Sequence, residues 1–167
     1  MAAKAELEGK GMVVAKKAPN FNVKDENSQP FQFYEALQKG PALLVFYPGD
    51  FRIFCTSQLC TYRDKWSDFK DLGVQVFGLS HNSSEEHKNF TEQYQFPFPL
   101  LSDTDNAVAR TFGCTSRYLL GGVSRSVVVV SKSGMVLYRY VEPTTLSSKK
   151  ADELLAILRD LRQNKLL

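Results

Sequence analysis

The chain has 167 residues, of which 43% are hydrophobic and 23% are charged, and its formal net charge is +3. This length and composition are typical of one folded α/β domain and exclude a disordered chain. The basic residues are interleaved with acidic ones, which argues against nucleic-acid binding. No apolar run approaches the roughly 20 residues that cross a bilayer. We therefore expect neither a nucleic-acid partner nor a membrane partner.

The cysteines are expected to have a chemical role rather than a structural one. Three cysteines are too few for a disulfide scaffold in a chain of this length. Together with two histidines they show no zinc-like spacing, so we expect no metal site.

The N-terminal segment is too polar for a secretory signal. We expect residues 1–11 to form a flexible arm and residues 12–167 to form a single domain. The predicted location is the cytoplasm or a similarly reducing compartment, and the removal of an organelle-targeting segment ahead of residue 1 is compatible with this sequence.

The first predicted elements are strands. Residues 21–23 and 31–33 alternate apolar and polar side chains around the turn-forming run at 25–28, which predicts an N-terminal β-hairpin. The continuous apolar run at 42–47 predicts a central strand covered on both faces. It ends at Pro48-Gly49-Asp50, a strong loop signal.

A helical pattern then begins at Cys55. Apolar residues recur there at intervals of three and four: Cys55, Leu59, Tyr62, Trp66, Phe69 and Leu72. They form one apolar stripe, and Gly73 is placed to end the helix. Residues 74–79 predict the next strand.

The second half begins with a helix. Ser83 or Ser84 caps this helix, which runs to about Tyr94, and Glu86 completes a capping box. The prolines in residues 96–99 favour an extended segment. The remaining elements are a shorter helix at 106–112, a strand at 127–130, its hairpin partner at 135–141 and a last helix that starts at Ser147 or Ser148.

This order of elements predicts an α/β fold with a mixed central sheet and helices on both faces. It resembles a thioredoxin-like fold with an N-terminal β-hairpin extension. Ligands of open α/β sheets bind beyond the carboxyl ends of the parallel strands. The loop after Tyr47 and the start of the next helix lie there, and Cys55 lies with them.

Cys55 is the candidate nucleophile. A helix N-terminus favours a thiolate, the reactive form of cysteine. The alternative is an ordinary buried cysteine, but a Pro-Gly loop before Cys55 and a second cysteine after it favour chemistry. Cys60 follows five positions later. In an intact helix this spacing gives a Cα separation of about 8–9 Å, whereas a disulfide needs about 4.4–6.8 Å. If the two cysteines pair, the start of the helix must unwind.

From about Gly11 to its C-terminus the chain resembles the peroxiredoxin Q class, also called bacterioferritin comigratory proteins. The resemblance is carried by the segments KAPNFNVKDENSQPF, VFYPGD, CTSQLCTYRDKWSDFKDLGVQVFGLS, EEHKNFTEQYQFPFPLLSD and SRSVVVVSKSG, and by the spacing between them. It implies a thioredoxin-dependent peroxidase that reduces hydrogen peroxide or alkyl hydroperoxides without a metal or organic cofactor.

The resemblance also implies roles for individual residues. Cys55 matches the peroxidatic cysteine, which becomes a sulfenic acid, and Cys60 matches the resolving cysteine, which forms a disulfide with it. Arg125 matches the arginine that stabilises the thiolate and the peroxide. Pro48 matches a proline that shields the nucleophile, and Gln58 occupies a position from which relatives orient that arginine. Thioredoxin or a glutaredoxin-type dithiol is the expected reductant, and we expect a monomer or a weak dimer.

Arg52 departs from the pattern of this class, which has Thr or Ser three residues before the nucleophile. A hydroxyl accepts and donates hydrogen bonds, whereas a guanidinium only donates. Arg52 either lines the peroxide pocket or points to solvent. Two other functions therefore stay open: a redox sensor or disulfide-transfer protein with weak peroxidase turnover, and a non-catalytic thioredoxin-fold interaction module.

Overall fold

The computed structural model describes residues 16–116, 119–142 and 148–167. Its main strands are β1 (Lys16–Lys17), β2 (Asn22–Lys24), β3 (Pro30–Gln32), β4 (Ala42–Phe46), β5 (Gln75–Ser80), β6 (Leu100–Ser102), β9 (Ser126–Val130) and β10 (Met135–Val141). A short separate pair consists of β7 (Thr115–Ser116) and β8 (Gly122–Val123). The helices are α2 (Phe33–Leu37), α3 (Ile53–Asp64), α4 (Trp66–Asp71), α5 (Ser84–Tyr94), α6 (Ala107–Thr111) and α7 (Ala151–Gln163).

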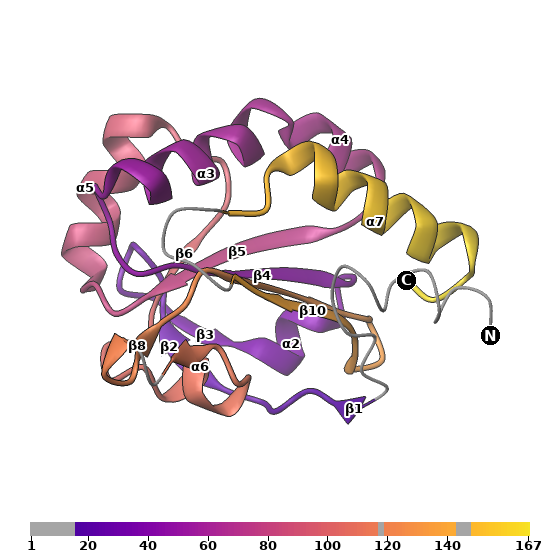
Figure 1. Cartoon of the computed structure of the whole chain (residues 1–167), viewed down its shortest axis with the longest axis horizontal. Helices are drawn as coiled ribbons and strands as arrows, with labels where there is room; N and C mark the ends of the chain where they lie inside the picture. The colour runs from indigo at the N-terminus through magenta and orange to yellow at the C-terminus, as the bar shows by residue number, and fades with distance from the viewer. Residues whose placement is uncertain (1–15, 117–118, 143–147) are drawn as a thin grey trace.

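One mixed sheet with the strand order β1-β10-β9-β4-β5-β6-β2-β3 forms the centre of the described part of the chain. Strands β4, β5 and β6 are parallel, whereas β9 and β10 form an antiparallel hairpin beside β4. Strands β2 and β3 form the predicted N-terminal hairpin and join the sheet through Lys24, which pairs with Ser102 of β6. Helices α3, α4, α5 and α7 lie on one face of the sheet and α2 and α6 on the other (Figure 1). The predicted α/β fold with helices on both faces is confirmed.

Two apolar cores lie on opposite faces of the sheet, and β4 contributes to both. Its residues Leu43 and Val45 pack with α3, α4, α5 and α7, whereas Leu44 and Phe46 pack with α2 and α6. All five residues of β4 are buried, because a strand covered on both faces has no solvent side. Because β4 is packed on both faces, its carboxyl end has a defined position, and the loop that leads to Cys55 starts from there.

The predicted helix that starts at Cys55 is two helices in the structure. Lys65 has backbone dihedrals of φ −106° and ψ 19°, outside the helical region, and separates α3 from α4. The apolar stripe continues across the break, since Leu59, Tyr62 and Phe69 are all fully buried. Apolar spacing therefore indicated the buried face correctly but did not reveal the break.

Two further boundaries differ from the prediction. Phe33 begins α2 rather than ending a strand, because the Gln32 side chain caps that helix by accepting a hydrogen bond from the Glu35 amide at 2.7 Å. The last helix starts at Ala151, later than predicted. Its first amide donates to the Thr61 hydroxyl of α3 at 3.3 Å, so a tertiary contact replaces a serine cap. Ser147 and the predicted arm at 1–11 lie outside the described residues.

Candidate active site

Cys55 lies at the carboxyl end of the central parallel strand, where the sequence placed it. A loop at residues 47–52 leads from β4 to α3, and Cys55 is the third residue of that helix. Its side chain is fully buried and belongs to the core beneath α3. Cys55 therefore lies in the first turn of α3.

Arg125 lies beside the sulfur although it is 70 positions away in the sequence. Its Nη2 donates a hydrogen bond to Cys55 Sγ at 3.5 Å, and its guanidinium lies 5.5 Å from the centre of the Phe54 ring. The residue is buried just before β9, and its carbonyl accepts a backbone hydrogen bond from Glu142 at 2.8 Å. The fold therefore places a guanidinium group directly beside the Cys55 sulfur.

A cavity of about 390 Å³ opens next to this pair. It is lined by Pro48, Arg52, His81, Asn106, Leu119, Gly122, Val123 and Arg125. Three residues proposed from the sequence, Pro48, Arg52 and Arg125, therefore share one cavity wall. Cys55 is not among the lining residues, in keeping with its burial.

Arg52 is exposed and lies on this cavity wall. It occupies the N-cap of α3 with an extended backbone but makes no side-chain capping hydrogen bond. Its side chain crosses Gly49 so closely that a Cβ atom there would meet Arg52 Nε at 3.2 Å. A capping side chain must accept hydrogen bonds from helix amides, and a guanidinium has no acceptor.

Gln58 lies one turn after Cys55 on the buried face of α3. Its Nε2 donates to the Tyr62 hydroxyl at 2.8 Å, and that hydroxyl donates to the Lys149 carbonyl. The Gln58 Oε1 atom is buried and has no hydrogen-bond partner among the described residues. In this conformation Gln58 thus holds Tyr62 rather than Arg125, and its role in orienting the arginine stays a prediction.

Cys60 shares the unbroken helix α3 with Cys55 and is half-buried. All three cysteines are free thiols. Burial raises the pKa of Cys60, so its thiol form dominates near neutral pH. Cys114 is fully buried, and burial raises the pKa of its thiol too. The Cys114 thiol faces the Phe112 carbonyl at 3.6 Å, which agrees with a core role.

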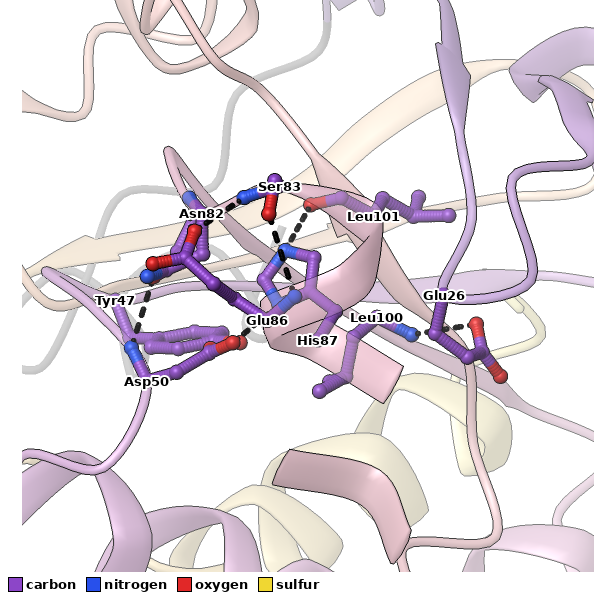
Figure 2. Close-up of polar contacts among 10 residues, drawn as sticks. Glu26, Tyr47, Asp50, Asn82, Ser83, Glu86, His87, Leu100 and Leu101 are labelled. Carbon is purple, nitrogen blue, oxygen red and sulfur yellow. Dashed lines mark hydrogen bonds and ion pairs between the residues drawn. The ribbon is translucent and has the colours of Figure 1, made fainter. Parts of the chain in front are cut away.

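The structure adds a buried polar cluster that the sequence did not reveal, formed by Tyr47, Asp50 and His87 (Figure 2). The sequence predicts Asp50 only as part of the loop after β4. One signal was available: His87 shares the apolar face of α5 with Phe90, and a buried imidazole needs hydrogen-bond partners. Burial first, and then the Asp50 carboxylate, raise the pKa of Tyr47 well above its usual value.

The described residues contain no group of three or more His, Cys, Asp or Glu side chains suited to a metal ion. None of their helices is long and apolar enough to cross a bilayer.

Comparisons with known proteins agree with this geometry. The model of the AhpC/TSA family matches residues 14–139. Peroxiredoxin Q from Sedum lineare, a chloroplastic protein, is 36% identical over 144 residues, which cover 86% of this chain and 76% of that protein. Chloroplastic peroxiredoxin Q from Triticum aestivum is 36% identical over 122 residues, which cover 73% of this chain and 56% of that protein.

Solved structures support the same assignment. Peroxidoxin BcpB from Mycobacterium tuberculosis superimposes with a TM-score of 0.81 at 30% identity, covering 90% of this chain and 99% of that one. The bacterioferritin comigratory protein of Xanthomonas campestris gives a TM-score of 0.75 at 25% identity, covering 83% and 90%. These relatives do not favour a redox sensor or an interaction module. The chain belongs to the AhpC/TSA family and, within it, to the peroxiredoxin Q class of thiol-dependent peroxidases.

Proposed function

We propose that Cys55 is the nucleophile of this peroxidase, that Cys60 resolves its oxidised form and that Arg125 stabilises the anion. The hydrogen bond from Arg125 Nη2 to Cys55 Sγ at the first turn of α3 is the observation that carries this proposal. Thiolate attack on a peroxide needs a positive group that binds both the sulfur and the developing negative charge on oxygen.

The first step transfers one oxygen atom. The Cys55 thiolate attacks the nearer peroxide oxygen, the O–O bond breaks, and the leaving oxygen takes a proton to become water or an alcohol. Sulfur is oxidised by two electrons to a sulfenic acid. The cavity wall of Pro48, Arg52 and Arg125 is the proposed binding place of the peroxide.

The second step forms the disulfide. The Cys60 sulfur attacks the sulfenic sulfur of Cys55, and the hydroxyl leaves as water with the proton of the Cys60 thiol. An external dithiol of the thioredoxin or glutaredoxin type then exchanges with this disulfide, regenerating both thiols and becoming oxidised itself. Pairing requires α3 to open, because the intact helix holds the two Cα atoms about 8–9 Å apart.

Alkyl hydroperoxides are proposed as substrates beside hydrogen peroxide. Several apolar side chains near the site are exposed: Phe51, Ile53, Phe54, Leu119 and Leu120. Leu119 lines the cavity itself, so an alkyl group has apolar surface available next to the peroxide. The Xanthomonas campestris relative reduces alkyl peroxides.

The compartment, the reductant and the assembly stay proposals. We propose a reducing compartment and a monomer or weak dimer. The two plant relatives named above are chloroplastic, so a plastid and the cytoplasm both fit the required thiol chemistry.

The deciding experiment is mass spectrometry after one equivalent of peroxide. We expect a Cys55–Cys60 disulfide in the wild type and none in Cys55→Ser, with Cys114→Ser behaving as the wild type. Rapid peroxide loss without this disulfide would remove Cys60 from the proposal. Wild-type turnover by Cys55→Ser would remove Cys55.

A further inference from the structure

The hydrogen-bond partners of His87 determine how many protons the buried cluster holds. Its Nε2 atom lies 3.1 Å from the Leu101 carbonyl, which only accepts, so Nε2 carries a hydrogen. Its Nδ1 atom lies 2.7 Å from Asp50 Oδ2, with both side chains at most 1% exposed. A proton must lie in that second contact too. The pair is therefore either imidazolium with carboxylate or imidazole with carboxylic acid, and in both forms it is neutral overall.

Asp50 is held by three different parts of the fold (Figure 2). Its Oδ1 accepts from the Tyr47 hydroxyl at 2.7 Å, its Oδ2 contacts His87 of α5, and its backbone amide donates to Asn82 Oδ1 at 2.9 Å. These contacts fix the loop between β4 and α3 from the sheet side and from the α5 side. Hydrogen bonds in a buried site stabilise the structure when all their partners are present.

The backbone conformation and the exposure of the side chains both change directly after Asp50. Phe51 adopts a left-handed backbone with φ 61°, and the next residues, up to Phe54, are all exposed. The Phe51 ring lies 4.8 Å from that of Phe90 on α5, which is the same helix that carries His87. The segment before Cys55 thus consists of a largely buried part that ends at Asp50 and an exposed part that follows it.

We propose that the Asp50–His87 pair is a positioning pair that holds the start of α3 in its closed form. The closed form places Cys55 against Arg125 for the reaction with peroxide, whereas the disulfide needs an open form. The pair therefore speeds the first step and slows the second. This inference rests on the proposed function.

The decisive comparison uses two substitutions of Asp50. Asp50→Ala removes both side-chain contacts. Asp50→Asn preserves them, because its amide can donate to Nδ1 of a neutral His87 while its oxygen accepts from Tyr47. Asp103→Ala is the matched control: Asp103 is another buried carboxylate, and its oxygens accept from the amides of Val108 and Ala109 of α6.

Three quantities are measured: the rate of the first step by stopped flow, the rate of disulfide formation by quenched mass spectrometry, and amide exchange at residues 51–56 in the reduced protein. In Asp50→Ala we expect about a tenfold slower first step, equivalent to about 1.4 kcal/mol, together with faster disulfide formation and faster exchange. Asp50→Asn should stay near the wild type in all three. Asp103→Ala should lose stability without these changes.

A pair with a merely structural role would not change the rate of the first step and the rate of disulfide formation in opposite directions. Equal changes in both rates, or an unchanged exchange at 51–56 in Asp50→Ala, would overturn the proposal. If Asp50→Ala does not fold, Tyr47→Phe removes one of the same contacts and should show the same directions at smaller size; no change there would overturn it as well. A wild type that never reacts with peroxide contradicts the proposed function instead, and amide exchange in the reduced variants still decides whether the pair holds the loop.

Discussion

Cys55 and Cys60 lie in one unbroken helix, fully buried and half-buried respectively, and point in directions that differ by about 140°. Their pairing is therefore incompatible with the structure in which Cys55 contacts Arg125. Under the proposed mechanism the protein therefore leaves its peroxide-reactive conformation once in every catalytic cycle.

Oxidation should accordingly open the start of α3. We expect amide exchange at residues 55–60 to be faster in the disulfide form than in the reduced form, because the backbone hydrogen bonds of that turn are lost. The exchange of α5 serves as the internal reference. Equal protection of residues 55–60 in the two forms would contradict the geometric argument.

Removal of the resolving thiol should separate the two steps. Cys60→Ser should react once with peroxide at the wild-type rate and then stop as a sulfenic acid on Cys55. A reagent specific for sulfenic acids should label this variant strongly, and Cys60→Ser with Cys114→Ser should be labelled equally. Absence of label in the single variant but label in the double variant would make Cys114 the resolving partner.

Glu26 provides a test of pH dependence. Burial raises its pKa above 4.5, while its Oε2 accepts from the Leu100 amide at 3.3 Å. A raised pKa in the folded state means that folding favours the protonated form, so ionised Glu26 destabilises the protein above that pKa. Glu26→Gln should therefore raise the free energy of unfolding at pH 7.

The gain should be less than about 1 kcal/mol because Glu26 is only half-buried and solvent screens its charge. It should disappear as the pH falls below 4.5, where the carboxyl is protonated in both the folded and the unfolded chain. Urea unfolding of both proteins at pH 7 and pH 4 measures this. A gain that persists at pH 4 would show that ionisation is not its cause.

The sequence predicted those parts of the molecule that depend on local patterns. The apolar run of β4 and the Pro-Gly loop after it placed Cys55 at the carboxyl end of a parallel strand, and the structure agrees. The capping box of Ser83 and Glu86 was equally visible, since both partners lie within one turn.

Other parts depend on contacts between distant segments and were missed for that reason. Asp50 meets His87 across 37 positions, and His87 meets Leu101 across 14. The start of α7 is set by Thr61, 90 positions earlier. No local rule marks such partners, although a histidine on an apolar helix face signals that one exists.

Arg52 allows a direct test of what a hydroxyl contributes at the N-cap of α3. A threonine at this position can accept a hydrogen bond from the Cys55 amide, the third of the helix, as N-cap residues do. It can also accept a hydrogen bond from the peroxide, which the guanidinium of Arg52 cannot. Arg52→Thr should therefore react faster with peroxide, by about tenfold for each 1.4 kcal/mol gained in the transition state.

Arg52→Ala is the control, because it removes the charge and the bulk of the arginine without adding a hydroxyl. In stopped-flow measurements at matched pH, the threonine variant should react with peroxide faster than the wild type. It should also react faster than the alanine variant. The N-cap should also raise the stability of the threonine variant above that of the alanine variant by about 0.5–2 kcal/mol. Equal acceleration in both variants would mean that the arginine crowds the cavity and that no hydroxyl is needed. A slower threonine variant would mean that Arg52 itself assists the reaction from the wall it shares with Pro48 and Arg125.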